Sequence, residues 1–321
     1  MSNESEPTDL TKLVLTQMPG RSCLDATNPH KLVAMTNCES MSEIFPNWVQ
    51  RAYLGPSPTK CSYRPFDLNM PTSILRRNRI AHSVDSPLTE FGKVCATIRA
   101  RQLIQAKIIP GQIFCSHELR SAETACEIAK VFAADGYQDI PIFIDVSLSE
   151  WRNFDESQTE KYWLTVKEFR QIGYHHVHEN YLPVRVVADL PTSETPQQYL
   201  DRLVEFLASV VQNYKDCSML IGSSALLSLM SGAWWKSGND LQRIRNEFTS
   251  SSMAIHCVPG CKSEAEKTKP NAKNNLSSRG EGEAGRRSGH AISRVNDDTA
   301  AIAARIGGAI RFNGVNDNVY L

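Results

Sequence analysis

The side chains best suited to chemistry gather between residues 116 and 124, where the sequence reads SHELRSAET. Ser116 ends the short apolar run of residues 113–115, which is typical of a buried strand. Arg120 falls in the first turn of the helix that the following residues predict. A guanidinium beside the free N–H groups of a helix N-terminus suits a phosphate. The pattern therefore favours an anion site at Arg120 and Ser116, and a capped helix with a solvated arginine is the competing interpretation.

The elements that must position this site alternate along the chain. Apolar runs predict strands at 12–16, 112–116, 142–146, 218–221 and 252–258, and helical spacing predicts helices at 89–105, 118–133, 160–172, 196–214 and 225–234. Strands that alternate with helices indicate an α/β fold, a three-layer α/β/α sandwich with a mainly parallel sheet. Such sheets bind ligands at the carboxyl ends of their strands, so Arg120 is expected at that edge.

Helix 89–105 is expected to begin at Thr89 and to bury a face that includes Phe91, Val94, Cys95, Ile98, Arg101 and Leu103. Residues 22–64 carry scattered prolines and predict a long loop with one helical turn near Trp48. The composition turns polar from residue 262, which predicts a largely disordered tail over 262–321. The domain is therefore expected to span 12–261, after a flexible N-terminus at 1–11.

Composition excludes several classes of function. The formal net charge of +0 gives no general pull toward nucleic acid or an anionic membrane. No run approaches the roughly 18 apolar residues of a membrane helix. The nine cysteines are scattered, which favours a reducing, cytoplasmic setting. No cofactor or metal site is expected, although alternation could bring His176 and His178 to one face and permit a metal; surface histidines are the favoured interpretation.

Four motifs in sequence order carry a family resemblance. They are DLNMP at 67–71, DSPLTEFG at 85–92, FCSHELRSAETA at 114–125 and LSEW at 148–151. Together they resemble the histidine phosphatase (phosphoglycerate mutase-like) superfamily, most closely the branch of the Sts phosphatase domains and ecdysteroid-phosphate phosphatase. The likeness covers about 12–258, with no ubiquitin-associated or SH3 domain recognised before it, so we expect the phosphatase-like domain alone.

The resemblance implies a mechanism and a set of roles. In this family a histidine within an Arg-His-Gly-Glu-Arg motif, after the first strand, attacks the phosphoryl group. A second histidine after a late strand, together with arginines, stabilises the group in transfer, and a carboxylic acid protonates the leaving group. By this resemblance Arg120 is a phosphate-binding arginine, and Glu150 lies near the position of the acid.

Both histidines are expected to be replaced. Thr16 and Gln17 fall where the resemblance places Arg-His, so Gln17 takes the position of the nucleophile, and Arg21 could supply a displaced guanidinium. In SMLIGSSALLS, Ser224, or Ser223 under a shift of one residue, takes the position of the second histidine. An amide has no nucleophilic lone pair near neutral pH. We therefore predict a catalytically inactive protein that retains binding of a phosphorylated small molecule or protein.

Two alternatives remain open at this point. One is an active or weakly active phosphomonoesterase with a substituted nucleophile such as His117 or Cys115, although Cys115-x4-Arg120 is one residue short of the loop of cysteine phosphatases. The other is a purely structural or interaction protein that works through the 22–64 region or the tail. A homodimer is also left open.

Overall fold

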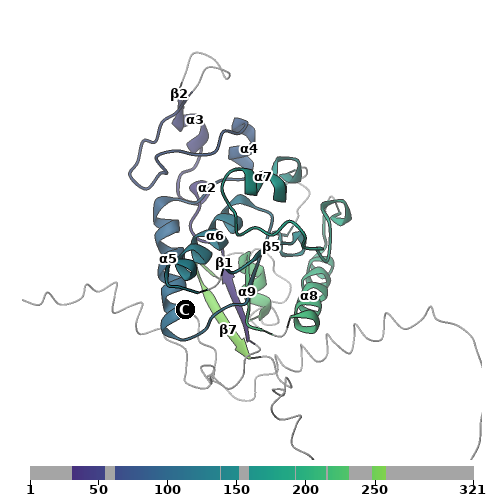
Figure 1. The fold of residues 1–321 in the computed structure, drawn as a ribbon. Helices are drawn as coiled ribbons and strands as arrows, with labels where there is room; N and C mark the ends of the chain where they lie inside the picture. Colours follow the sequence, from purple (N-terminus) through teal and green to yellow (C-terminus); the bar gives the residue numbers. More distant parts are fainter. Residues whose placement is uncertain are drawn as a thin grey trace, which may run out of the picture.

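A five-stranded sheet forms the centre of the molecule, with helices on both of its faces (Figure 1). The computed structural model describes residues 31–54, 62–137, 139–151, 159–191, 193–214, 216–230 and 248–257. The strand order is β5-β4-β6-β1-β7, from Ile142–Ile144, Gln112–Cys115, Ser218–Gly222, Lys31–Thr36 and Met253–Cys257. The pairs β5–β4, β4–β6 and β6–β1 are parallel, and β7 runs antiparallel to β1. The expected three-layer α/β architecture is confirmed.

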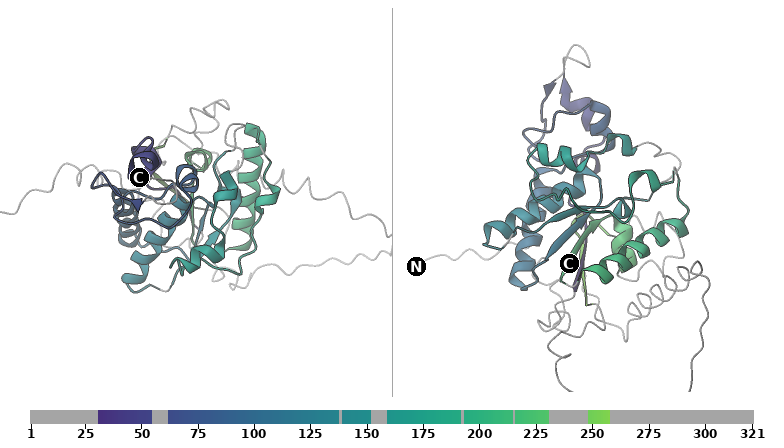
Figure 2. Two further views of the ribbon diagram at one scale, coloured as in Figure 1. Left: turned by 90° about the horizontal axis from the view of Figure 1, so that it is seen from above. Right: turned by 45° about the vertical axis from the view of Figure 1, so that its right-hand side comes forward.

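The strands are buried on both faces, which explains why they consist of continuous apolar runs. Because successive side chains point to opposite faces, Val33, Ile113 and Met219 pack with α5 and α6, and Leu32, Phe114 and Leu220 pack with α8 and α9. These helices span Glu90–Gln105, Leu119–Ala134, Pro196–Asn213 and Ser224–Met230. Figure 2 shows the two helical layers from above, on opposite sides of the sheet.

Most of the expected elements are confirmed, but the prediction of one continuous helix over 160–172 is wrong. It is split into η4, Thr159–Tyr162, and α7, Val166–Gln171, because Thr165 caps a new helix by accepting a hydrogen bond from the backbone of Glu168. Two further 3-10 turns are η2, Val146–Leu148, and η5, Val187–Asp189. Among the described residues no helix is long and apolar enough to cross a lipid bilayer.

The expectation of a long loop over 22–64 is wrong for the described part. This part contains β1, α2 (Met41–Ile44), α3 (Trp48–Ala52), β2 (Tyr53–Leu54) and β3 (Ser62–Tyr63), and α4 (Arg79–Val84) packs against α3. The helical turn near Trp48 is confirmed as α3. In Figure 1 the small lobe of α3, β2 and α4 stands beyond the carboxyl end of β1. The strand expected at 12–16 lies outside the described residues.

Helix α5 buries a different face from the one expected. Thr89 caps it as predicted, since its Oγ1 accepts a hydrogen bond from the Gly92 N–H at 2.9 Å. However, Phe91, Val94 and Ile98 are 55%, 51% and 39% exposed. The buried positions are Gly92, Ala96, Ala100 and Leu103. Small residues let α5 approach its neighbours closely. A search for large apolar residues at helical spacing does not find a buried face of this kind.

Candidate functional site

A polar pocket of about 290 Å³ opens at the carboxyl ends of β1 and β6, beside the first turn of α6. Most of its lining side chains are hydroxyls or amides, with three charged groups and one aromatic ring. The lining residues are Thr36, Asn37, Ser40, Ser42, Glu43, Arg120, Glu150, Ser223, Ser224, Phe248 and Ser250. The pocket therefore lies at the edge of the sheet where parallel α/β folds bind ligands.

Arg120 is the cation of this pocket. Its Nη2 lies 2.8 Å from Oε2 of Glu150, and the side chains are 18% and 38% exposed. Burial acts to lower the pKa of Arg120, but the carboxylates of Glu150, Glu118 and Asp85 outweigh it and raise the pKa. The guanidinium is thus charged at every working pH, and one carboxylate already contacts it.

Two carboxylates fix the backbone on either side of the Arg120–Glu150 pair. The Asp85 side chain accepts a hydrogen bond from the N–H of Leu119 at 2.7 Å. Glu118, at the N-cap, accepts one from the N–H of Glu150 at 3.0 Å. These contacts bring the start of α6 and the segment after η2 to the same wall, which places Arg120 and Glu150 side by side.

The turn after β1 forms a second wall. Thr36 Oγ1 donates to the carbonyl of Thr249 at 2.9 Å and accepts from the N–H of Ser252 at 2.9 Å. The N–H of Asn37 donates to the carbonyl of Gly222 at 3.0 Å. The turn therefore joins β1 to the ends of β6 and β7, and it holds Thr36 and Asn37 at the pocket.

Helix α2 supplies the acidic side of the pocket. Glu43 accepts a hydrogen bond from the hydroxyl of Ser250, and its other oxygen accepts one from the N–H of Ser40 at 3.3 Å. Ser42 Oγ lies 2.7 Å from Oγ of Ser86. Glu43 thus links α2 to the segment before β7, and its carboxylate adds a second negative charge to the lining.

The end of β6 contributes two hydroxyls. Ser223 follows the last strand residue, and its Oγ lies 3.0 Å from the hydroxyl of Tyr199 on α8. Ser224 begins α9, and its Oγ accepts a hydrogen bond from the N–H of Phe248 at 3.2 Å. Both serines line the pocket.

The structure brings Arg120, Glu150, Ser223 and Ser224 together in one pocket, as the sequence led us to expect. Ser116 is elsewhere: it is 2% exposed, its N–H donates to the carbonyl of Ile221 at 3.1 Å, and it is not among the residues that line the pocket. Thr16, Gln17 and Arg21 lie outside the described residues.

Sequence reasoning missed Thr36, Asn37, Ser40 and Glu43. The signal was present, because the run KLVAMT at 31–36 is apolar and ends in polar residues. The similar run KLVLT at 12–16 gives the same local signal for a first strand. Pairing of β1 with β6 and β7, which is not visible in a local pattern, distinguishes the two runs.

The candidate substitute nucleophiles do not line this pocket. Cys115 packs inside the core, and burial raises its pKa well above the ordinary value for a thiol. His117 stacks on Trp163 with ring centroids 5.5 Å apart, and burial lowers its pKa. Cys38, next to Asn37, is also buried, which raises its pKa to about 12. These cysteines are therefore neutral thiols at physiological pH rather than nucleophilic thiolates.

The histidines of the 175–178 segment give no metal centre. His176 and His178 flank the residue that bridges β5: the N–H of Ile142 donates to the carbonyl of His176 at 2.8 Å, and the N–H of His178 donates to the carbonyl of Ile142 at 2.9 Å. Within the described ranges, no group of three His, Cys, Asp or Glu side chains is placed to hold a metal ion.

Comparison with known proteins decides the family. The model of the histidine phosphatase superfamily (branch 1) matches residues 72–257, which is more than half of the chain. The chain belongs to the histidine phosphatase superfamily. This membership rests on the match over the segment that carries Arg120, Glu150, Ser223 and Ser224.

Relatives of known name agree with this assignment. Ubiquitin-associated and SH3 domain-containing protein B of Mus musculus is 25% identical over 180 residues, which are 55% of this chain and 27% of that protein. Ecdysteroid-phosphate phosphatase of Drosophila melanogaster is 23% identical over 248 residues, which are 74% of this chain and 31% of that protein. The chain thus spans less than a third of the length of these relatives.

A solved structure shows the same fold. The crystal structure of the ecdysone phosphate phosphatase from Bombix mori, in complex with tungstate, superposes with a TM-score of 0.56 at 18% sequence identity. The alignment covers 83% of this chain and 99% of that chain. The sheet and its helical layers are therefore those of the histidine phosphatase fold.

Proposed function

We propose that this chain is a histidine phosphatase domain that has lost its phosphoryl-transfer chemistry and binds a phosphorylated small molecule or protein. The observation that carries the proposal is the composition of the pocket. Its described lining residues include no histidine, although it opens at the edge of the sheet where the family carries out its reaction. Its serines, threonine and asparagine offer hydrogen bonds, but none of the described lining residues supplies the imidazole that the family's reaction uses.

We assign the position of the first histidine to Asn37 rather than to Gln17. β1 is the first described strand of the sheet. The segment Thr36-Asn37-Cys38-Glu39-Ser40 begins at its last residue and has the spacing of the family's Arg-His-Gly-Glu-Arg motif. Glu39 matches the glutamate of that motif, and it accepts hydrogen bonds from Asn69 at 2.9 Å and Thr89 at 2.7 Å. Thr36 and Ser40 then stand in place of two arginines.

The second histidine position falls to Ser223 or Ser224, at the end of β6. Neither an amide nor a hydroxyl without a neighbouring base can form the covalent phosphoryl intermediate of this family. In comparable covalent sites, loss of the nucleophile lowers the rate by on the order of 10⁶. Replacement of both histidines by residues of these types argues for a protein without turnover.

Anion binding is proposed to persist through Arg120. Among the described residues that line the pocket it is the sole cation, and its guanidinium can hold a phosphate by two parallel hydrogen bonds. The carboxylates of Glu43 and Glu150 oppose a dianion. Binding is therefore expected to be weaker than in a pocket that has several arginines.

Tungstate binding to the full chain tests this proposal. We expect tungstate to raise the melting temperature, because a ligand of the native state stabilises it by mass action. The shift should vanish in Arg120→Ala and persist in Lys130→Ala, which removes an exposed cation elsewhere on α6. A shift that survives in Arg120→Ala would show that the anion binds outside this pocket, and the assignment of the site would fall.

A further inference from the structure

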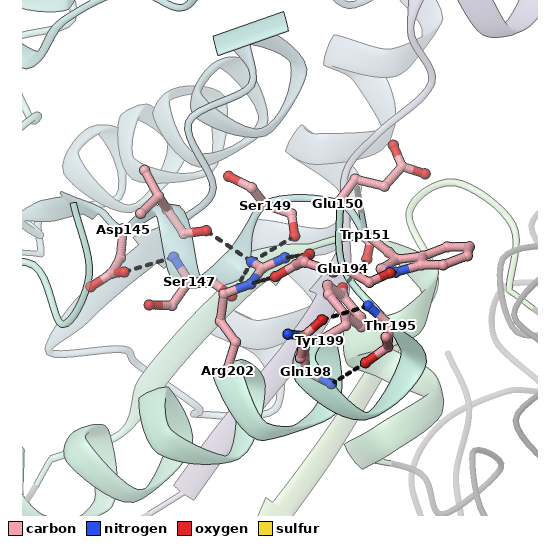
Figure 3. A network of polar contacts seen from close by, with 12 residues as sticks. Asp145, Ser147, Ser149, Glu150, Trp151, Glu194, Thr195, Gln198, Tyr199 and Arg202 are labelled. Carbon is pink, nitrogen blue, oxygen red and sulfur yellow. Dashed lines mark hydrogen bonds and ion pairs between the residues drawn. The ribbon is translucent and has the colours of Figure 1, made fainter. Parts of the chain in front are cut away.

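A buried arginine on α8, Arg202, binds the backbone of the residues that precede Glu150. We propose that Arg202 is a positioning residue that sets the anion affinity of the pocket by holding Glu150 against Arg120. This inference rests on the proposed anion site. Figure 3 shows the guanidinium of Arg202 directed at the backbone of residues 146–149, with the side chain of Glu150 pointing away from it.

Arg202 is fully buried, and each nitrogen of its guanidinium donates at least one hydrogen bond. Its Nε and Nη2 donate to the two carboxylate oxygens of Glu194 at 2.7 and 2.6 Å. Both side chains are nearly inaccessible, at 0% and 1% exposed. A bidentate pair of this kind fixes the plane of the guanidinium, and so it fixes the direction in which the third nitrogen points.

That third nitrogen holds the turn before Glu150. Nη1 of Arg202 donates to the carbonyls of Val146, Ser147 and Ser149 at 3.0, 2.9 and 3.1 Å. The last carbonyls of a helical turn lack partners within the turn. The carbonyl of Val146, at the start of η2, also accepts a hydrogen bond from the N–H of Ser149 at 3.1 Å. Arg202 contacts all three carbonyls through one nitrogen, which holds the end of η2 in a single conformation.

The residues on both sides of Glu150 are bound by Glu194 and Arg202. The indole N–H of Trp151 donates to the carbonyl of Glu194 at 2.8 Å (Figure 3). Ser149 precedes Glu150 and is held by Arg202. The N–H of Glu150 itself donates to Glu118 at 3.0 Å. The Glu194–Arg202 pair thus determines where the Glu150 side chain leaves the backbone.

This position has an electrostatic consequence at the pocket. The carboxylate of Glu150 lies 2.8 Å from Nη2 of Arg120. It therefore pairs with the guanidinium that an incoming anion has to contact. It also repels that anion, since like charges at short distance oppose each other. Holding Glu150 in place therefore lowers anion affinity. Loosening the segment lets Glu150 move away and raises affinity, whereas a merely structural Arg202 would leave affinity unchanged or weaken it.

The experiment measures tungstate affinity by calorimetry on the full chain, well below its melting temperature. Arg202→Lys keeps a charge beside Glu194 but cannot reach all three carbonyls. We expect it to melt at a lower temperature and yet to bind tungstate more tightly, by about fivefold, which is the low end of ordinary coupling between sites. Glu150→Gln should also tighten binding, and the double variant should gain little over Glu150→Gln because both changes act through the same carboxylate.

Two further variants keep the test decisive. Val210→Ala, in the buried face of α8, should lower the melting temperature without changing tungstate affinity. Trp151→Phe removes one hydrogen bond and should give a smaller gain in affinity if Arg202→Lys does not fold. Unchanged or weaker binding in Arg202→Lys and Trp151→Phe, with tighter binding in Glu150→Gln, would overturn the role of Arg202 alone. Absence of tungstate binding in both the native chain and Glu150→Gln would overturn the anion site itself.

Discussion

Glu123 is a carboxylic acid that the fold keeps away from water. It is 9% exposed and accepts hydrogen bonds from the N–H of Leu88 at 2.6 Å and the hydroxyl of Tyr174 at 3.0 Å. Burial raises its pKa to about 7. Burial also raises the pKa of Asp85, to about 6, although Arg77 and the N–H of Leu119 act in the opposite direction. Both groups therefore link stability to pH.

The contribution of Glu123 to stability is expected to fall as the pH rises from about 5 to 8. Glu123 in the unfolded chain ionises near the ordinary glutamate pKa of 4.5, while in the folded chain it holds its proton to about pH 7. Its stabilising contribution is thus fully present below the unfolded pKa and is lost as pH rises through the folded pKa. The difference can reach about 3 kcal/mol.

Glu123→Gln tests this directly, because the amide oxygen still accepts from Leu88 and the titration is removed. Urea unfolding of this variant should show a smaller fall in the free energy of unfolding between pH 5 and pH 8 than the native chain shows. Glu127→Gln, which changes a neighbour that pairs with Lys130, should keep the native slope. Equal slopes in Glu123→Gln and the native chain would rule out Glu123 as the titrating group.

At the scale of elements, the close approach of α5 to the turn after β1 depends on Gly92. A Cβ added there would overlap the backbone carbonyl of Glu39. Asn69 lies beside the start of α5. Its backbone carbonyl accepts a hydrogen bond from the N–H of Glu90, and its side-chain oxygen accepts one from the N–H of Phe91. The DLNMP and DSPLTEFG motifs thus lock the start of α5 to Glu39, in the turn that continues from Asn37.

Gly92→Ala should lower stability by about 1–3 kcal/mol, because overpacking outweighs the better helix propensity of alanine. Chemical denaturation with circular dichroism measures the change. Val94→Ala, at an exposed position of the same helix, should be nearly neutral. A more stable Gly92→Ala would mean that the backbone at Glu39 yields, and the account of this contact would be wrong.

Element types could be predicted from the sequence where one local pattern dominated. After a polar first residue, the runs at 112–115 and 218–222 are apolar, because both faces of β4 and β6 are covered. The face of α6 was predictable because its buried residues recur at helical spacing. The face of α5 was not, since it packs through glycine and alanine and leaves Phe91 and Val94 exposed.

At the scale of the molecule, parallel topology brings together residues that are far apart in the chain. Thr36, Arg120, Glu150 and Ser224 reach one pocket because β1, β4, β5 and β6 all end at the same edge. Ser250 joins them because the antiparallel β7 begins there. The sequence could therefore place Arg120 and Glu150 at a shared edge. It could not choose between the strands at 12–16 and 31–36, because pairing across more than 180 positions decides that choice.

The central claim is that this histidine phosphatase fold binds an anion without transferring a phosphoryl group. The most direct measurement is phosphate release from a generic aryl phosphate by the purified full chain, with Arg120→Ala assayed beside it. We predict no release above the level of the Arg120→Ala variant. Release that follows the chain through purification and disappears in Arg120→Ala would contradict the account, because it would require a working nucleophile in this pocket.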